Sequence, residues 1–399
     1  MKVVLITTIT PAAENIRGTS ALPYHLLVKR NDDIKVDIYT FNLNRLPNEK
    51  IQAVQKELHA NIHLLNVPKW MDWMEKPYML MLRVFMRYPI TSYLRLDNKA
   101  AAAIKASHPD GIWIFGEEIG RLMTSFPEYK RVHIGPDSEA LYYYRMLGQR
   151  FVTESRSMLL RQMVMYPKYL QLEREYIADK NAVYYVVGEA DAAFIKRMNP
   201  NCRSEFLRHP HYEIGADVKD IKFHTPIRLL IAGQYNYYMQ QDANALVEAM
   251  VQHGGRALRS SYELTFLGKG WDRHVNELKE NGWNVKNIEF APDYIEEVRR
   301  HDIQITPISI GTGTKGKVLD ALANGLLVIG TPFAMENIAI ENNKSCIVYK
   351  NATEVLDILS QITAQREKFE QMATNGRKCV LEEHDRKKIS QQLFDTFTH

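Results

Sequence analysis

The sequence predicts two α/β domains, each built on a doubly wound parallel sheet. Short apolar runs alternate with helical patterns through both halves of the 399 residues, and this alternation is typical of parallel sheets with crossover helices. The alternation stops between Arg208 and Pro226, where the chain is polar and contains two prolines. A chain of this length also exceeds what one hydrophobic core usually supports. We therefore expect two Rossmann-like domains that face a central cleft.

The domain boundaries follow from the place where the alternation stops. We expect residues 1–212 to form the N-terminal domain, 213–226 the linker and 227–380 the C-terminal domain. The remaining residues, 381–399, are expected to form a helix that packs back on the N-terminal domain.

Each predicted strand is an apolar run that ends at glycine or polar residues. In the first half, strands are expected at 3–9, 34–41, 62–65, 109–116 and 182–188, with a strand-to-loop junction at 131–138. In the second half they are expected at 228–233, 262–268, 288–290, 303–308, 326–329 and 347–349. Helical patterns lie between most of them, and the chain from Thr353 onwards is helical.

The composition is that of an ordinary globular protein. Hydrophobic residues make up 45% and charged residues 25%, and the net charge of +4 is too mild for a nucleic-acid stripe. The three cysteines have neither disulfide nor zinc spacing, which favours a reducing, cytoplasmic location. The first residues lack a signal-peptide cleavage site, and no 18-residue apolar run predicts a membrane span.

The stretch from Gly311 to Gly325 has the layout of a phosphate cradle. It lies between two apolar runs and reads as a strand, a loop rich in glycine and threonine, and a short helix. Gly311 and Gly313 allow a sharp turn, and Thr314 is expected to cap the helix. Lys315 and Lys317 would oppose the helix dipole by about 0.3–1 kcal/mol unless an anion binds there. The alternative is that both ammonium groups extend into water.

Polar residues also follow the strands predicted in the first half. Glu117 follows the strand that ends at Gly116, and His133 and Asp137 lie at the next junction. The carboxyl ends of parallel strands are where ligands bind in open sheets. His133 is a candidate catalytic residue, with a satisfied structural histidine as the alternative. Asp137 is a second candidate, with a helix N-cap as its alternative.

Residues 68–88 combine two tryptophans and five methionines with scattered lysine and arginine. One interpretation is a helix whose aromatic and methionine stripe faces the core. The other is an exposed surface that contacts an acceptor or the inner face of a membrane.

Several segments resemble the GT-B glycosyltransferases, specifically their large retaining family four. The stretch GTGTKGKVLDAL from Gly311 is similar to that family's GGGTRxKVLEAL block. Residues 232–246, 266–270 and 287–294 resemble the family's other loops around the nucleotide. The resemblance covers most of the chain and is strongest from Ile231 to Glu341.

The resemblance implies a role for each matching residue. Residues that would line the diphosphate or the nucleotide are Gly311, Thr312, Gly313, Thr314, Lys315, Gln234 and Ala291. Lys315 would also be the catalytic phosphate cation, and Asp320 would bond the ribose hydroxyls. In the N-terminal domain, Gly18 and Glu117 would face the cleft, and His133 or Asp137 would contact the donor sugar. The sequence departs from the family at Thr312, which stands where the family has glutamate, and at Gln234 and Tyr235, which stand where it has a basic residue.

The resemblance also implies a function. The expected activity is transfer of a sugar from a nucleotide diphosphate sugar to a glycan or lipid-linked acceptor held by the N-terminal domain, with retention and with neither metal nor cofactor. The pathway would be synthesis of a cell-surface polysaccharide or glycoconjugate. The alternatives are a sugar-nucleotide epimerase, which would need carboxylates such as Glu117 and Glu118 in the cleft, and a non-catalytic subunit that binds a glycan or a partner through 68–88.

Overall fold

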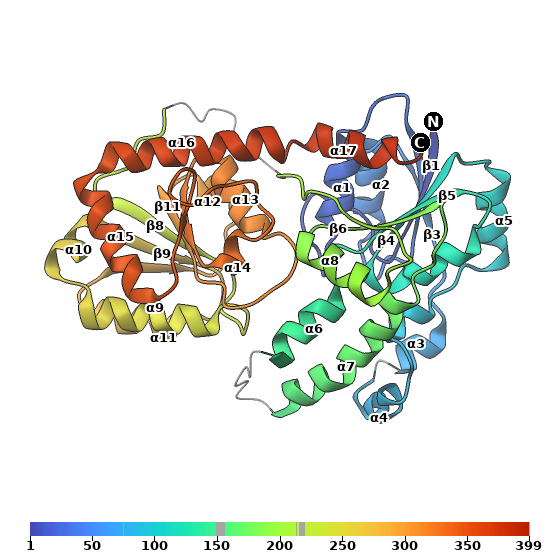
Figure 1. Cartoon of the computed structure of the whole chain (residues 1–399), viewed down its shortest axis with the longest axis horizontal. Coiled ribbons are helices and arrows are strands. Elements are labelled where there is room, and N and C mark those ends of the chain that lie inside the picture. The colour runs from blue at the N-terminus through green and yellow to red at the C-terminus, as the bar shows by residue number, and fades with distance from the viewer. Residues whose placement is uncertain (75, 149–155, 213, 215–219, 399) are drawn as a thin grey trace. The chain divides into compact units, whose positions relative to one another are not determined.

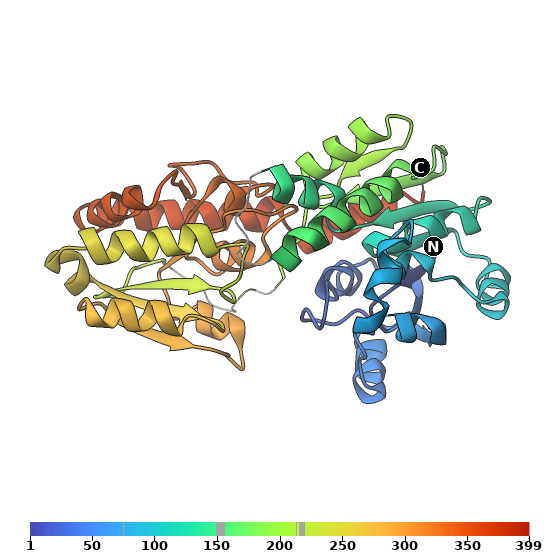
Figure 2. The ribbon, with the colours of Figure 1, turned by 90° about the horizontal axis from the view of Figure 1, so that it is seen from below.

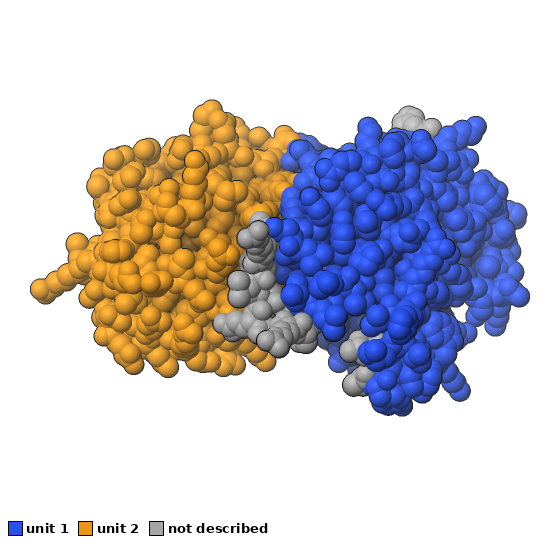
Figure 3. Space-filling view, turned by 60° about the horizontal axis from the view of Figure 1, so that its bottom comes forward, with its two compact units in different colours: residues 1–210, 386–399 blue, residues 211–385 orange. Residues whose placement is uncertain are grey.

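The protein divides into two compact units. The computed structural model describes residues 1–74, 76–148, 156–212, 214 and 220–398. Unit 1 comprises Met1–Pro210 and Arg386–His399, and unit 2 comprises His211–Asp385 (Figure 3). The predicted linker at 213–226 lies partly outside the described residues, since 213 and 215–219 are not among them. No helix in the described part of the chain is both long and apolar enough to cross a membrane.

Unit 1 contains a parallel sheet of seven strands in the order β3-β2-β1-β4-β5-β6-β7. The strands are β1 (Lys2–Thr7), β2 (Lys35–Thr40), β3 (Asn61–Leu64), β4 (Gly111–Phe115), β5 (Lys130–Ile134), β6 (Ala182–Val186) and β7 (Ser204–Phe206). The chain runs outward from β1 to β3 and then returns to place β4 on the other side of β1. The loops after β1 and β4 therefore leave in opposite directions and form a topological switch point.

Helices cover both faces of this sheet (Figures 1 and 2). The helices described in unit 1 are α1 (Ala21–Val28), α2 (Asn48–Glu57), α3 (Lys69–Met74), α4 (Leu80–Val84), α5 (Asn98–Ala106), α6 (Glu139–Gly148), α7 (Arg156–Arg174), α8 (Glu189–Met198) and α17 (Arg386–Asp395), with the 3-10 helices η1 (Pro77–Met79), η2 (Ile90–Tyr93) and η3 (Glu117–Ser125). The last helix, α17, belongs to unit 1 and lies against α1, where the Ser390 hydroxyl donates to the Leu26 carbonyl at 2.6 Å.

Unit 2 contains a second parallel sheet, of six strands, in the order β10-β9-β8-β11-β12-β13. The strands are β8 (Ile227–Ala232), β9 (Tyr262–Leu267), β10 (Asn284–Ile288), β11 (Ile303–Thr306), β12 (Leu327–Gly330) and β13 (Ile347–Val348). The helices are α9 (Gln240–His253), α10 (Arg256–Ser261), α11 (Asp272–Glu280), α12 (Tyr294–Val298), α13 (Gly316–Ala323), α14 (Pro332–Met335), α15 (Ala352–Ala364) and α16 (Arg366–Glu383). The switch point of this sheet lies between β8 and β11.

The core of unit 2 explains why its strands are continuous apolar runs. Successive side chains of a strand point to opposite faces of the sheet. Leu229 and Ile231 enter one buried cluster with α9, α11 and α15, whereas Leu230 and Ala232 enter another with α13 and α14. Both faces of this sheet are therefore covered by apolar side chains, as is typical of parallel sheets, whose strands are buried on both sides.

The sequence predictions fail mainly at the sheet edges and in residues 68–88. β7 was not predicted, and β10 begins four residues earlier than expected, at Asn284 instead of Ile288. Both are edge strands with few buried side chains, so they lack the apolar run that identifies a central strand. The interpretation of 68–88 as one helix is also wrong, because the described residues there form the short elements α3, η1 and α4.

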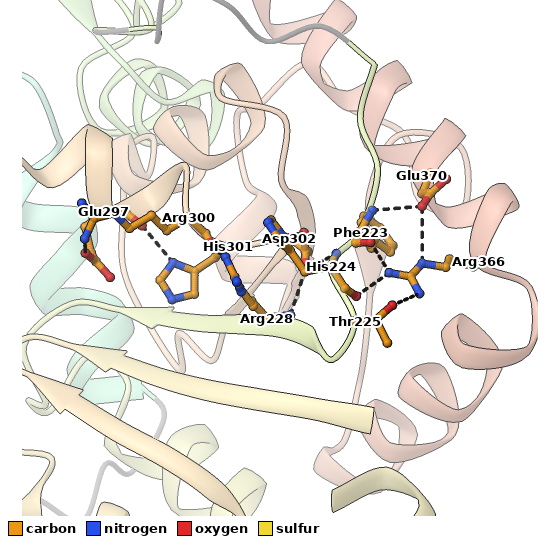
Figure 4. Close-up of polar contacts among 10 residues, drawn as sticks. All are labelled: Phe223, His224, Thr225, Arg228, Glu297, Arg300, His301, Asp302, Arg366 and Glu370. Atoms are coloured by element: carbon orange, nitrogen blue, oxygen red, sulfur yellow. Dashed lines mark hydrogen bonds and ion pairs between the residues drawn. The ribbon is translucent and has the colours of Figure 1, made fainter. Parts of the chain in front are cut away.

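Two buried carboxylates hold the segment that enters unit 2 (Figure 4). Asp302 accepts hydrogen bonds from the backbone N–H groups of His224 and Arg228, at 3.0 and 2.8 Å. Glu370 accepts from the Phe223 N–H at 2.9 Å and from the Lys222 ammonium at 2.8 Å. Burial alone would raise the pKa of Glu370, but these hydrogen bonds outweigh burial and lower it.

We predict that Glu370→Gln lowers the free energy of unfolding by about 1–2 kcal/mol at neutral pH, because it removes a charged acceptor from a buried network. A carboxyl whose folded pKa is lowered stabilises the protein above its unfolded pKa of 4.5, and this contribution is lost as pH falls through the folded value. The difference from the wild type should therefore shrink below about pH 4. Urea denaturation at both pH values measures it, with the exposed Glu367→Gln as the control. A difference that does not depend on pH would contradict this account.

Candidate functional site

In unit 2, glycines bring the loops after β8 and β9 into close contact. Gly233 and Gly268 both have positive φ, at 133° and 144°. A Cβ atom on Gly268 would lie 2.3 Å from the Gly233 carbonyl oxygen, so a side chain there would clash with backbone. The Trp271 indole N–H donates to the same oxygen at 2.8 Å. These contacts fix the carboxyl edge of the sheet on one side of the switch point.

The loops that leave the two strands at the switch point are joined to each other. The Ser309 N–H, after β11, donates to the Tyr238 carbonyl, after β8, at 2.7 Å. The Ser309 hydroxyl accepts from the N–H of Asp242 in α9 at 3.0 Å. The predicted site residue Gln234 lies in the same loop as Tyr238 and is exposed. The structure therefore brings this loop together with the loop that leads to Gly311.

The Gly311–Lys315 loop folds around its own lysine. The Lys315 ammonium donates to the carbonyls of Thr312 and Gly313, at 2.7 and 3.1 Å. A Cβ atom on Gly311 would lie 3.0 Å from the Lys315 Cε atom, so glycine leaves room for this side chain. Gly313 has φ 61°, and its carbonyl also accepts from Asn337 at 2.8 Å. The loop thus carries a fixed positive charge at the start of α13.

Helix α13 begins one residue later than the sequence predicted. Its N-cap is Lys315, which makes no side-chain capping hydrogen bond, so the expected cap at Thr314 is wrong. The N–H groups of Gly316 and Lys317 open the helix and have no acceptor within it, as in any first helical turn. With the helix dipole, they favour an anion at this end.

Asp320 lies one turn into α13, beside two tyrosines. Asp320 is buried, with only 8% of its surface exposed. Burial raises the pKa of Tyr212 and Tyr294, and the negative charge of Asp320 raises both further. The Lys317 ammonium lies 4.3 Å from the centroid of the Tyr294 ring. Asp320 therefore stands among groups that can bond hydroxyls or stack on a planar ring.

The remaining residues predicted to contact the nucleotide, Thr312 and Ala291, lie near α13. Thr312, which is predicted to line the diphosphate, is 9% exposed. Ala291 follows β10 and packs against the buried cluster of α13. Sequence reasoning missed Tyr212, since it lies far from the motif in the chain. It also missed Asn337, which lies in the segment after α14.

In unit 1, the loops after β4 and β5 meet at the carboxyl edge. Gly116 has φ 130°, and a Cβ atom there would lie 2.8 Å from the Thr8 hydroxyl after β1. A Cβ atom on Gly135 would lie 3.5 Å from the Glu117 Cα atom. Burial, followed by the charges of Glu118 and Asp137, raises the pKa of Glu117 to about 8. Glu117 is therefore protonated at neutral pH.

The imidazole of His133 is buried and contacts a backbone carbonyl. The residue is 1% exposed, and its Nε2 atom lies 2.9 Å from the Gly116 carbonyl oxygen. Tyr176 and Tyr184 pack edge-on against the imidazole. Burial lowers its pKa to about 4, so the ring is neutral and its Nε2 atom donates to the carbonyl. This geometry matches the structural alternative, and we leave His133 out of the reaction proposed below.

The loop that carries Asp137 is tied down by buried carboxylates. The Ser138 N–H donates to Asp191 of α8 at 2.8 Å, and the Ser138 hydroxyl donates to Glu173 of α7 at 2.8 Å. The Leu141 N–H in turn donates to the Ser138 hydroxyl, so Ser138 caps α6, and the alternative of a cap at Asp137 is wrong. Gly18 lies elsewhere, in an exposed part of the loop after β1.

We predict that the wild type loses more stability than Glu173→Gln as pH rises from about 5 to 8, because burial raises the pKa of Glu173 from 4.5 to about 8. The folded state holds the proton of Glu173 and the unfolded state releases it. This carboxyl therefore lowers the free energy of unfolding by up to about 1.4 kcal/mol per pH unit. Glu173→Gln, which keeps the hydrogen-bonding shape, should show a flatter dependence in denaturation experiments. Equal slopes for the wild type and this variant would contradict the assignment. The exposed Glu49→Gln should keep the wild-type slope.

Comparison with known proteins supports this architecture. A family model described as glycosyl transferase-like matches residues 241–395, which lie mostly in unit 2. No curated protein matches the sequence. HepE from Anabaena, solved in complex with UDP, is 12% identical in sequence. The match covers 100% of this chain and 100% of that chain, with a TM-score of 0.62.

Two further solved structures agree. Sucrose-phosphate synthase from Thermosynechococcus elongatus is 12% identical, with 100% of this chain and 98% of that chain covered and a TM-score of 0.65. WaaG, a glycosyltransferase involved in lipopolysaccharide biosynthesis, is 14% identical, with 99% of both chains covered and a TM-score of 0.62. Identities this low speak for the fold alone. The chain therefore has the GT-B fold predicted from its sequence, and its second unit carries the match to the glycosyl transferase-like family.

Proposed function

We propose that this protein is a glycosyltransferase that moves a sugar from a nucleotide diphosphate sugar to a glycan or lipid-linked acceptor. The observation that carries the proposal is the Gly311–Lys315 loop, which presents a fixed ammonium and the start of α13 beside the switch point of unit 2. The glycosyl transferase-like match over 241–395 and the relatives solved with UDP support the same activity. We place the reaction in cell-surface polysaccharide or glycoconjugate synthesis, in the cytoplasm.

In the proposed reaction, unit 2 stabilises the leaving group. The bond between the anomeric carbon and the diphosphate oxygen breaks, and negative charge develops on the diphosphate. Lys315 and the first N–H groups of α13 take up that charge, so the proposal requires no metal. Asp320 accepts hydrogen bonds from the ribose hydroxyls, and the Tyr294 ring offers a stacking surface. We propose that the acceptor hydroxyl attacks on the same face, which retains the anomeric configuration, and that its proton passes to the departing diphosphate oxygen.

A sugar-nucleotide epimerase is the second candidate, and the raised pKa of Glu117 favours it. A carboxyl with a pKa of about 8 is protonated at neutral pH and can act as a general acid. Incubation with UDP-, GDP- and ADP-linked sugars distinguishes the candidates. Nucleotide release with a glycan or lipid acceptor supports a transferase, isomerised donor supports an epimerase, and neither product supports a non-catalytic subunit.

We predict that Lys315→Ala lowers turnover by about two to three orders of magnitude, because it removes a donor that stabilises the departing diphosphate. The matched control is Lys279→Ala, which removes an exposed ammonium from α11 of the same unit. Nucleotide release measures the rate, and thermal melting checks that both variants fold. An unchanged rate for Lys315→Ala with normal folding would remove Lys315 from the reaction.

We also propose that residues 68–88 contact the inner face of a membrane. Six large side chains among the described residues of this segment are exposed, and we refer to them as the apolar surface: Trp70, Trp73, Tyr78, Met81, Leu82 and Phe85. The exposed fraction reaches 69% at Met81 and 82% at Phe85. The alternative of a stripe that faces the core holds for Met71, which is 2% exposed, but not for these six. Exposed Lys69 and Lys76 add positive charge that suits anionic lipids.

We predict that Met81→Ser with Phe85→Ser lowers partition onto lipid vesicles by roughly tenfold or more, because both side chains would lose the free energy of burial in the lipid. Vesicle sedimentation measures the partition. Phe290→Ser in unit 2, where Phe290 is 77% exposed, is the matched control and should leave partition unchanged. Equal partition of all three proteins would contradict the membrane contact.

A further inference from the structure

Unit 1 has a pocket of about 320 Å³ beside η3 and the end of α7, and none of the predicted site residues lines it. Its volume is at the lower end of the roughly 300–1,000 Å³ typical of small-molecule sites. Its lining includes Arg95, Arg121, Ser125 and Glu175. Tyr176 and Tyr184 also line it and stack with centroids 4.1 Å apart and planes at 9°.

The two arginines of this pocket form no ion pair with the carboxylate of its lining, Glu175. The Arg95 Nη1 atom donates to the carbonyls of Ser92 and Leu94, at 2.9 and 2.6 Å. Arg121 lies 4.3 Å from the centroid of the Tyr88 ring. Within the described residues, neither guanidinium takes part in an ion pair. Burial lowers the pKa of Arg95, and the like charge of Arg121 lowers it further.

The carboxylate in the lining is already engaged by other groups. Glu175 accepts hydrogen bonds from the Tyr88 hydroxyl, from Arg87 and from the Gln171 amide, the last at 2.6 Å. Burial alone would raise the pKa of Glu175, but these donors lower it, so it stays ionised and bound to them. The charge of Glu175 is therefore balanced by Arg87, and the pocket keeps the positive charge of Arg95 and Arg121.

A series of aromatic rings connects this pocket with the apolar surface. Arg121 lies over Tyr88, and Tyr88 packs against Tyr93 with centroids 5.9 Å apart. Tyr93 packs edge-on against Trp70 of the apolar surface, with centroids 6.3 Å apart. Trp70 is 42% exposed, whereas Tyr88 is 5% exposed. The exposed apolar side chains and the two guanidinium groups therefore belong to one packed cluster, which matches a molecule with hydrocarbon at one end and an anion at the other.

We propose that this pocket binds the phosphate group of a membrane lipid whose hydrocarbon chains lie against the apolar surface. A planar guanidinium donates two parallel hydrogen bonds to phosphate oxygens, and Arg95 with Arg121 provides two such groups. The Ser125 hydroxyl adds a further donor at the exposed rim. The inference rests on the proposed membrane contact and deepens it, because it assigns the lipid headgroup to a defined site.

The test uses a charge-conserving variant of the full chain, Arg95→Lys with Arg121→Lys. Sedimentation with phosphatidylcholine vesicles, with and without phosphatidic acid, measures the preference for the phosphate headgroup. We expect the double variant to lose about tenfold in that preference while its melting temperature stays unchanged, because lysine keeps the charge but not the bidentate fork. The matched control is Lys69→Arg with Lys76→Arg, which exchanges lysine and arginine beside the apolar surface and should keep the preference.

The outcomes separate this inference from the membrane contact. If the Arg-to-Lys variant keeps the wild-type preference, non-specific charge attracts the lipid and the pocket assignment is overturned. If the wild type binds glycerol 3-phosphate in solution with no preference among vesicles, the ligand is a free phosphate ester and the lipid is the wrong source. If the wild type binds no vesicle at all, the membrane contact itself fails, and donor turnover still tests the proposed transferase independently.

Discussion

Parallel pairing of every strand is the constraint on which both units depend. A parallel strand can be followed by another only if the chain crosses back over the sheet, so each connection runs across a face and each loop after a strand lies at the same edge. In both sheets the strand order reverses direction beside the first strand, at β1/β4 and at β8/β11. The loops that diverge there leave space for a ligand. The strand order alone determines the position of this space, whatever the side chains are.

At the carboxyl edge of the sheet in unit 2, glycines allow the loops to approach closely, and a lysine provides a positive charge. Close contact between the loops after β8 and β9 needs Gly268, since any side chain there would meet the Gly233 carbonyl. Lys315 then bonds two carbonyls of its own loop, which fixes an ammonium beside the start of a helix. A charge already held in position needs little reorganisation when an anion arrives, and that is the feature that makes electrostatic stabilisation effective.

Carboxyl groups removed from water behave in two ways in this protein. Unit 1 keeps Glu117 and Glu173 in surroundings that raise their pKa, whereas unit 2 holds Glu370 among donors that lower it. The first kind of carboxyl is a source of protons near neutral pH, and the second kind anchors a chain segment. Burial is common to both, so the number and charge of the hydrogen-bond donors decide which behaviour results.

The sequence predicted the central strands and the Gly311–Asp320 motif, because their signals are local: continuous apolar runs and glycines at fixed spacing. The edge strand β10 was misplaced, since Val285 is its one buried side chain and gives no pattern. Contacts between distant segments could not be predicted at all. Tyr212 beside Asp320 and Tyr238 bonded to Ser309 depend on how the loops fold together. The sequence places His133 in a strand, but it does not show that the Nε2 atom is hydrogen-bonded to the Gly116 carbonyl.

The central claim is that the loop at 311–315 and the start of α13 bind a nucleotide diphosphate. Amide hydrogen exchange of the full chain, with and without UDP, GDP and ADP, tests it most directly, because a bound diphosphate would protect the N–H groups that contact it. The account predicts slower exchange within residues 311–318 for at least one of the three nucleotides. Unchanged exchange in this segment with all three at saturating concentration would contradict it.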